Sequence, residues 1–66
     1  MTVQEYLEVE KIDRDFIEQE FSGPYWESAL SFVDDNYERD VDALSEKQVS
    51  WLAKILDDCV EKRIEG

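Results

Sequence analysis

Histidine is absent from this chain and cysteine occurs once, and these two shortages exclude several kinds of site. Structural zinc sites are built from cysteine and histidine, so the chain lacks the ligands for one. A single cysteine cannot close an internal disulfide, and an unpaired thiol is typical of the reducing cytoplasm. Nucleophilic catalysis generally needs histidine or an equivalent base in a cleft, for which 66 residues leave little room. We therefore expect no enzyme activity, no catalytic residue, no metal and no cofactor.

Glycine, proline and long apolar runs are also scarce, with two glycines and one proline in the chain. Gly23 and Pro24 follow Ser22, and together they form the clearest break between helices. No apolar run is long enough to cross a bilayer, and no basic segment precedes an apolar one as in a signal peptide. The sequence therefore predicts a cytoplasmic protein with no membrane partner.

The length allows a single domain, residues 1–66, with a small core. A chain of this size buries only about 60% of the surface that it exposes when unfolded, so its stability depends on helix packing, a partner or self-association. Hydrophobic residues make up 42% of the chain, which is more than a disordered acidic tail would carry. We therefore expect a folded domain whose core contains several of the aromatic side chains.

The longest predicted helix covers residues 45–64. Ser45 and Gln48 have the spacing of a capping box, which marks its start. Apolar residues then recur at steps of three and four, the pattern of an amphipathic helix. The predicted buried stripe contains Val49, Leu52, Leu56, Cys59 and Val60, and it is widened by Trp51, Ile55 and Ile64. Cys59 is interpreted as a core residue, because unpaired cysteines are commonly buried.

Two helical segments precede it, so the predicted fold is an all-α bundle of three main helices. Apolar spacing predicts a helix over residues 24–38. The pattern over residues 3–22 is also helical but weakens near residues 10–13, where Asp13 can cap a new helix, so this segment is one helix or two short ones. Partial alternation in residues 3–9, VQEYLEV, leaves a short N-terminal strand as the structural alternative.

An acidic run that begins at Asp34 superficially resembles the calcium loop of an EF-hand. Position six of such a loop should be glycine and position twelve glutamate, but Arg39 and Ser45 stand there. We therefore reject a calcium site and interpret the run as a solvated face. Trp26 and Trp51 are interpreted chiefly as core anchors, and Trp51 is the better interface candidate because it lies at the edge of an apolar stripe.

Net charge is the strongest global signal. Eighteen acidic and seven basic residues give −11, beyond the magnitude of about 2–8 that keeps a small domain soluble. Residues 1–20 carry seven acidic and two basic residues, and residues 34–46 carry six acidic residues and one basic residue, so each segment has a net charge of −5. Residues 47–66 carry four acidic and four basic residues and are neutral. Such a field repels nucleic acid and anionic membranes and attracts basic surfaces. The predicted partner contacts are Asp34, Asp35, Glu38, Asp40 and Asp42, then Glu5, Glu8, Glu10, Asp13 and Asp15, with Trp51 as an apolar contact.

Residues 25–58 combine an aromatic-rich helix, a polar link and the segment LSEKQVSWLAKIL at 44–56. In this pattern, with its LS-x-KQ-x-x-WL core, the chain resembles small uncharacterised helical proteins of bacteriophages and mobile elements. The resemblance covers about half of the chain and assigns no catalytic or ligand residue. It implies a phage-encoded protein in the host cytoplasm, where small acidic proteins often act as inhibitors or adaptors of host machinery.

Together these observations predict a protein that works by being bound. The first hypothesis is an inhibitor whose carboxylates imitate the phosphates of nucleic acid and occupy the basic groove of a nucleic-acid-binding host protein, such as a defence nuclease. It predicts no direct contact with nucleic acid and an affinity that falls with salt. The alternative is a non-enzymatic adaptor or structural module that binds through its apolar helix faces, including as a homodimer, and whose charge only keeps it soluble.

Overall fold

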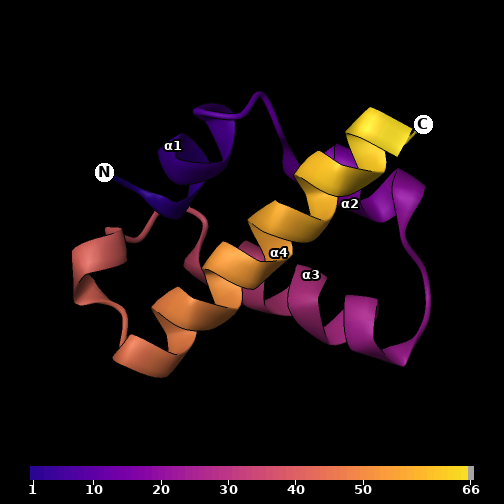
Figure 1. Ribbon diagram of the computed structural model, residues 1–66. Coiled ribbons are helices and arrows are strands. Elements are labelled where there is room, and N and C mark those ends of the chain that lie inside the picture. The colour runs from indigo at the N-terminus through magenta and orange to yellow at the C-terminus, as the bar shows by residue number, and fades with distance from the viewer. Residues whose placement is uncertain (66) are drawn as a thin grey trace.

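The computed structural model describes residues 1–65, and all of their regular structure is helical. In chain order the elements are α1 (Val3–Glu8), α2 (Arg14–Glu20), α3 (Pro24–Asn36), the short 3₁₀ helix η1 (Val41–Ala43) and α4 (Glu46–Glu65). Helix α4 crosses in front of the others, with α1 and η1 on one side of it and α2 and α3 behind it and on the other side (Figure 1). The predicted all-α fold is confirmed, and the first of its three predicted helices is divided in two.

Helix α1 begins at a capping box. Thr2 Oγ1 accepts a hydrogen bond from the Glu5 amide at 3.1 Å, and Glu5 Oε1 accepts one from the Thr2 amide at 2.8 Å. These bonds satisfy amides that the first turn of a helix leaves without a partner. Residues 3–8 are therefore helical, and the alternative of an N-terminal strand is wrong. Within residues 1–65 an isolated antiparallel bridge, Thr2 with Asp40, is the only extended pairing.

The chain turns between α1 and α2, where the apolar pattern of the sequence weakens. Lys11 has a φ of +59°, a left-handed conformation that an α-helix cannot include. Ile12 turns back into the core, and its amide donates to the Leu7 carbonyl at 3.1 Å. Asp13 then caps α2 by accepting a hydrogen bond from the Phe16 amide at 2.8 Å. Of the two forms left open by the sequence, the divided helix is the one observed.

Helix α3 begins where predicted and ends slightly early. It starts at Pro24, and the preceding Gly23 has a φ of +107°, a conformation that favours glycine. It ends at Asn36, whose side-chain amide donates to the Phe32 carbonyl at 2.8 Å. The prediction extended this helix two residues too far, to residue 38.

The chain leaves the helical path after α3 because it pairs with the start of α1. The Val3 amide donates to the Arg39 carbonyl at 2.9 Å, and the Gln4 amide donates to the Tyr37 carbonyl at 3.0 Å. Both amides belong to the first turn of α1 and would otherwise lack a protein partner. These long-range bonds therefore outweigh the local helical pattern and fix the connection between α3 and η1 against α1.

The core lies where α4 crosses the other helices. Its fully buried side chains include Val3, Leu7, Ile12, Ile17, Ala29, Val33, Leu52, Ile55 and Cys59. Cys59 is thus confirmed as a core residue. Val49 and Ile64 were predicted to lie on the buried stripe, but they are 38% and 77% exposed. At 3.6 residues per turn, Val49 lies roughly a quarter of a turn from the mean direction of Leu52, Ile55 and Cys59, and Ile64 lies farther round still.

Candidate functional site

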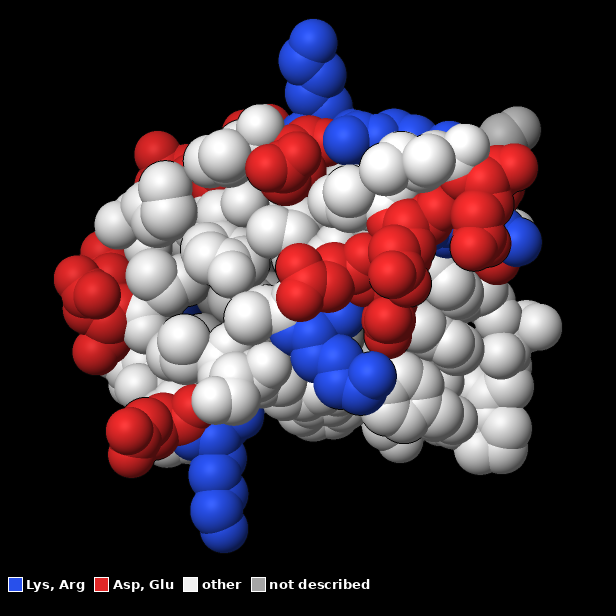
Figure 2. All heavy atoms as spheres, in the orientation of Figure 1, with Lys and Arg blue, Asp and Glu red and all other residues white. Residues whose placement is uncertain are grey.

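The two acidic segments of the sequence meet in the fold. The start of α1 bonds to the chain that follows α3, and Arg14 at the start of α2 binds Asp34 in the last turns of α3. We call the surface formed by α1, the start of α2 and residues 34–42 the acidic face. Figure 2 shows acidic side chains along the edge of the molecule at α1 and η1. Residues far apart in the sequence therefore contribute to one charged region.

Tyr37 is consistent with this convergence, because the charges of several carboxylates act on its phenol. Burial is the main cause that raises the pKa of Tyr37, and the negative charges of Glu8, Asp13 and Asp15 raise it further. These three residues come from α1 and the start of α2, whereas Tyr37 follows α3. The N-terminal acidic residues and the chain after α3 are thus within electrostatic reach of each other.

Arg14 is the centre of a set of ion pairs. Its Nε and Nη2 bind the two carboxylate oxygens of Asp34 at 2.6 and 3.1 Å, and its Nη1 contacts Glu18 at 2.8 Å and Asp15 at 3.3 Å. The hydrogen bonds to Asp34 are the main cause that raises the pKa of Arg14. Asp34 and Asp15, both predicted as partner contacts, are exposed but already paired within the protein.

Asp40 and Glu5 stabilise the junction between the N-terminus and η1. Asp40 accepts a hydrogen bond from the Asp42 amide at 2.9 Å and pairs with the amino group of Met1 at 3.2 Å. The bond from the Asp42 amide, followed by the amino terminus, lowers the pKa of Asp40. Hydrogen bonds from the backbone and side chain of Thr2 lower the pKa of Glu5. Both carboxylates are therefore charged at neutral pH and held in place.

The remaining N-terminal candidates also make contacts within the protein. Glu8 accepts a hydrogen bond from the Gln4 side chain at 3.1 Å, and Asp13 caps α2. Glu10 lies 3.7 Å from the guanidinium of Arg63, which also donates to the Glu10 carbonyl. Glu10 is therefore tied to the end of α4, apart from the other predicted contacts.

Asp35, Glu38 and Asp42 differ from the other predicted contacts. All three are exposed, and their carboxylates form no hydrogen bond or ion pair with residues 1–65. A partner can bind them without displacing an internal contact, so no buried or paired group is left unsatisfied. Among the predicted acidic contacts, these three carboxylates are therefore the ones most readily available to a partner.

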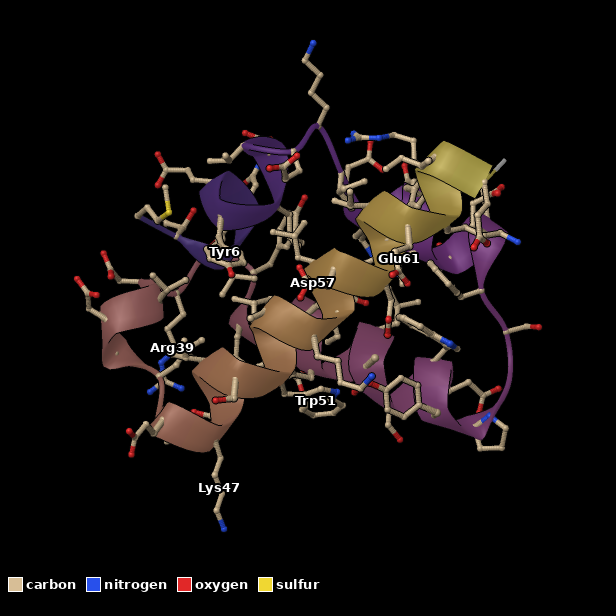
Figure 3. All side chains as sticks on the ribbon, viewed as in Figure 1. Tyr6, Arg39, Lys47, Trp51, Asp57 and Glu61 are labelled. Carbon is tan, nitrogen blue, oxygen red and sulfur yellow. The ribbon has the colours of Figure 1, made fainter. Side chains whose placement is uncertain are left out.

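Trp51 belongs to an aromatic cluster and makes no polar contact with the acidic candidates. Its ring stacks on Phe32 with centroids 4.7 Å apart and planes at 19°, and its Nε1 donates to the Tyr25 hydroxyl at 3.2 Å. Tyr25 also packs edge-on against Trp26, with centroids 5.1 Å apart. Figure 3 shows Trp51 beside α3, below α4. Both tryptophans are half-buried, so each anchors the fold while leaving part of its ring at the surface.

A groove between α2 and α3 was not anticipated from the sequence. It has a volume of about 270 Å³, and the rings of Phe21 and Trp26 stack within it at 3.9 Å. The other side chains that line it include Ile17, Glu18, Glu27 and Leu30. The signal in the sequence is the pair of aromatic residues on either side of the break at Gly23 and Pro24, but their stacking depends on how the two helices fold back on each other.

Helix α4 is nearly neutral overall but not uniform along its length. Lys47 projects near its start, whereas Asp57 and Glu61 project from the outer surface of its second half (Figure 3). Lys54 pairs with Asp58 at 3.7 Å, one turn away. The carboxylates of the second half form a further acidic patch on the face seen in Figure 2, which a charge count by segment does not reveal.

Comparisons of the chain with protein-family models, with curated proteins and with solved structures found no match. Across residues 1–65, no helix combines the length and apolar character needed to span a membrane. In the same range, no group of three or more Cys, His, Asp or Glu side chains is arranged to hold a metal ion. A function must therefore be inferred from the charge and geometry of the chain itself.

Proposed function

We propose that this protein binds the basic nucleic-acid groove of another protein through its acidic face and blocks that groove. The observation that carries the proposal is the meeting of two acidic segments, joined by the hydrogen bonds of α1 and by the Arg14–Asp34 pair. The proposed target is a host protein that handles nucleic acid, such as a defence nuclease. The resemblance of residues 25–58 to phage proteins suggests this setting.

The internal contacts of the acidic face support a binding role. Asp34 is held by Arg14, Asp40 by the amino terminus and Glu5 by Thr2. Carboxylates that are already fixed lose less conformational freedom when a partner binds, which favours affinity. The acidic face thus combines fixed charges with the accessible carboxylates of Asp35 and Glu38.

The chemistry of the proposed partner follows from the charge of the chain. A protein with a net charge of −11 is attracted to clusters of lysine and arginine and is repelled by nucleic acid. A groove that binds phosphates has such clusters and exchanges counterions on binding. The carboxylates of the acidic face would occupy the positions of phosphates, so this protein and nucleic acid would compete for the groove.

Capture from a bacterial lysate, with and without nuclease treatment, provides the first test. We expect a nucleic-acid-binding protein that stays bound after nuclease treatment and is displaced by added nucleic acid. Capture only of proteins that do not bind nucleic acid would contradict the proposal. A complex that excess nucleic acid fails to displace would contradict it equally.

Charge reversal at the three accessible carboxylates gives a sharper test. These carboxylates have no internal partner, so their replacement by lysine should leave the fold intact. The same replacement should weaken binding to the captured target. The control reverses three exposed carboxylates elsewhere, so that both variants change the net charge equally. The test variant is Asp35→Lys, Glu38→Lys and Asp42→Lys, and the control is Glu20→Lys, Glu27→Lys and Glu61→Lys. Equal loss of binding in both would refute a specific acidic face.

A second candidate function is an adaptor that binds through apolar surface. The observation that favours it is the aromatic cluster, in which Tyr25 is 44% exposed and Trp26 borders the groove between α2 and α3. Aromatic residues are common at the centres of protein interfaces. A complex made in this way would persist at high ionic strength and would be lost with Tyr25→Ser, whereas lysine at Asp35 and Glu38 would leave it unchanged.

A further inference from the structure

Helix α4 carries a second stripe beside its buried face, which we call the α4 seam. Its members follow one another at alternating steps of three and four residues, without a break. They are Glu46, Val49, Ala53, Leu56, Val60 and Arg63. This is the a/d spacing of a heptad repeat, by which helices pack side by side. The four central positions are apolar, and the two end positions are charged.

The α4 seam is only partly covered by the rest of the chain. Val49 is 38% exposed and the other three apolar positions are half-buried, whereas the core residues of α4 are fully buried. Figure 2 shows an uncharged area along the flank of α4 that faces α1, and Figure 3 places Tyr6 of α1 beside this flank. The seam therefore presents apolar surface that a further helix could bury.

The ends of the seam carry opposite charges. Glu46 is exposed and forms no ion pair within residues 1–65. Arg63 pairs with the Glu10 carboxylate at 3.7 Å and donates to the Glu10 carbonyl, but its side chain is 41% exposed and has further N–H donors for a second carboxylate. Because positions 46 and 63 are equally distant from the centre of the seam, two antiparallel copies would place Glu46 of each against Arg63 of the other. Two parallel copies would bring like charges together at both ends, which is unfavourable.

We propose that a second copy of this chain covers the α4 seam, with the two α4 helices antiparallel about a twofold axis. In such a contact each pair of residues occurs twice, so every favourable contact is doubled. The occupant of the seam needs an apolar stripe with an acid at one end and a base at the other, and α4 itself has that pattern. Residues 47–66 have equal numbers of acidic and basic residues, so two copies repel each other less along this helix than along the acidic face, although the second half of α4 carries an acidic patch.

The dimer is weak and reversible, because the seam is short. The stretch from Val49 to Val60 spans about 16 Å at 1.5 Å per residue. A single apolar stripe of that length buries less surface than an interface of standard size, which buries about 800 Å² on each partner. We therefore expect a weak association, in the micromolar to millimolar range. The seam contains no residue of the acidic face, so this inference stands or falls separately from the proposed function.

Sedimentation equilibrium over the micromolar to millimolar range tests the dimer directly. The weight-average mass of the wild type should rise from 7.8 kDa towards twice that value. In the antiparallel arrangement Val49 faces Val60 of the other copy, so Val49→Glu should keep the protein monomeric. The control is Val9→Glu, at a residue that is 67% exposed and outside the seam, which should dimerise like the wild type. A wild type that is monomeric at millimolar concentration overturns the proposal, as does a Val49→Glu variant that dimerises normally.

A charge swap tests the antiparallel orientation. Glu46→Arg and Arg63→Glu should each raise the dissociation constant of the dimer about tenfold, because each replaces two attractions by two repulsions. The double variant restores opposite charges and should return to within about threefold of the wild type. The two positions are about 25 Å apart along one helix, so recovery can only report a contact between copies. A double variant that dimerises as weakly as the single variants overturns the antiparallel dimer. Circular dichroism checks that each variant is folded.

Discussion

Arg14 holds both carboxylate oxygens of Asp34, with Nε at 2.6 Å from one and Nη2 at 3.1 Å from the other. The two residues are 20 positions apart, and their contact joins the start of α2 to the last turns of α3. Helices α2 and α3 form a hairpin that turns at Gly23, and the Arg14–Asp34 contact lies at the opposite end of this hairpin. The same guanidinium also pairs with Glu18, so one cation holds several carboxylates of a very acidic surface in place.

Replacing Arg14 by glutamine should lower the melting temperature by a few degrees, because the α2–α3 contact is lost and its carboxylates then repel one another. Lys11→Gln is the matched control. It also removes one positive charge, but Lys11 is exposed and forms no ion pair within residues 1–65. Thermal unfolding followed by circular dichroism compares the two. Equal melting temperatures for both variants would contradict the role assigned to Arg14.

Acid should remove the stability contributed by Glu5 and Asp40. Their pKa values are lowered in the folded protein, so their contribution is present above the unfolded pKa values, near 4, and is lost as the pH falls through the folded values. Protonation of other carboxylates relieves repulsion and acts in the opposite direction, so the measurement is made at high salt. Thr2→Val keeps the backbone amide that is the main cause of the Glu5 shift but removes the second cause, the Thr2 hydroxyl, so it should partly flatten the dependence of the unfolding free energy on pH. Identical pH profiles for wild type and variant would show that the capping box does not contribute in this way.

Truncating a side chain on the buried side of α4 should reduce the free energy of unfolding far more than truncating one on its exposed side. Leu52 is fully buried, so Leu52→Ala should reduce the free energy of unfolding by about 3 kcal/mol. Ile64 is 77% exposed, so Ile64→Ala should change it by less than about 0.5 kcal/mol. Urea unfolding measures both. Comparable losses would mean that the buried face of α4 is the wider stripe expected from the sequence.

The thiol of Cys59 should be protected in the folded protein. Burial raises its pKa to about 11, so little thiolate is present at neutral pH, and the side chain is fully buried. Because the folded pKa lies above the unfolded value, the thiol's contribution to stability is complete below about pH 8.5 and is lost as the pH rises towards the folded value. Reaction with a thiol reagent should be slow in buffer and fast in denaturant. Rapid labelling of the folded protein in buffer would contradict this burial.

The sequence was most informative where structure depends on close neighbours. The capping boxes of Thr2 with Glu5 and of Ser45 with Gln48 both form, with Ser45 Oγ accepting from the Gln48 amide at 3.2 Å. Asp13 caps α2 at the position where the apolar pattern weakens. These features need only the order of residues within about one helical turn, so periodicity and capping preferences were enough to place them.

Features that depend on long-range contacts were not predictable. Tyr37 continues the helical pattern, but its carbonyl and that of Arg39 bond to α1, and α3 ends early. The sequence ranked Asp34 among the first partner contacts, but it did not show that Arg14 already pairs with it. Val49 fits an amphipathic stripe equally well whether it faces the core or the flank of α4. In each case the outcome is set by residues distant in the sequence.

The most direct test of the acidic face is the salt dependence of its affinity for the captured target. If carboxylates replace phosphates in a basic groove, the logarithm of the association constant should fall steeply and linearly with the logarithm of salt concentration. The variant with lysine at Asp35, Glu38 and Asp42 should bind more weakly and with a shallower slope, whereas the control variant should keep the wild-type slope. An affinity that stays constant from low to high ionic strength would contradict the account.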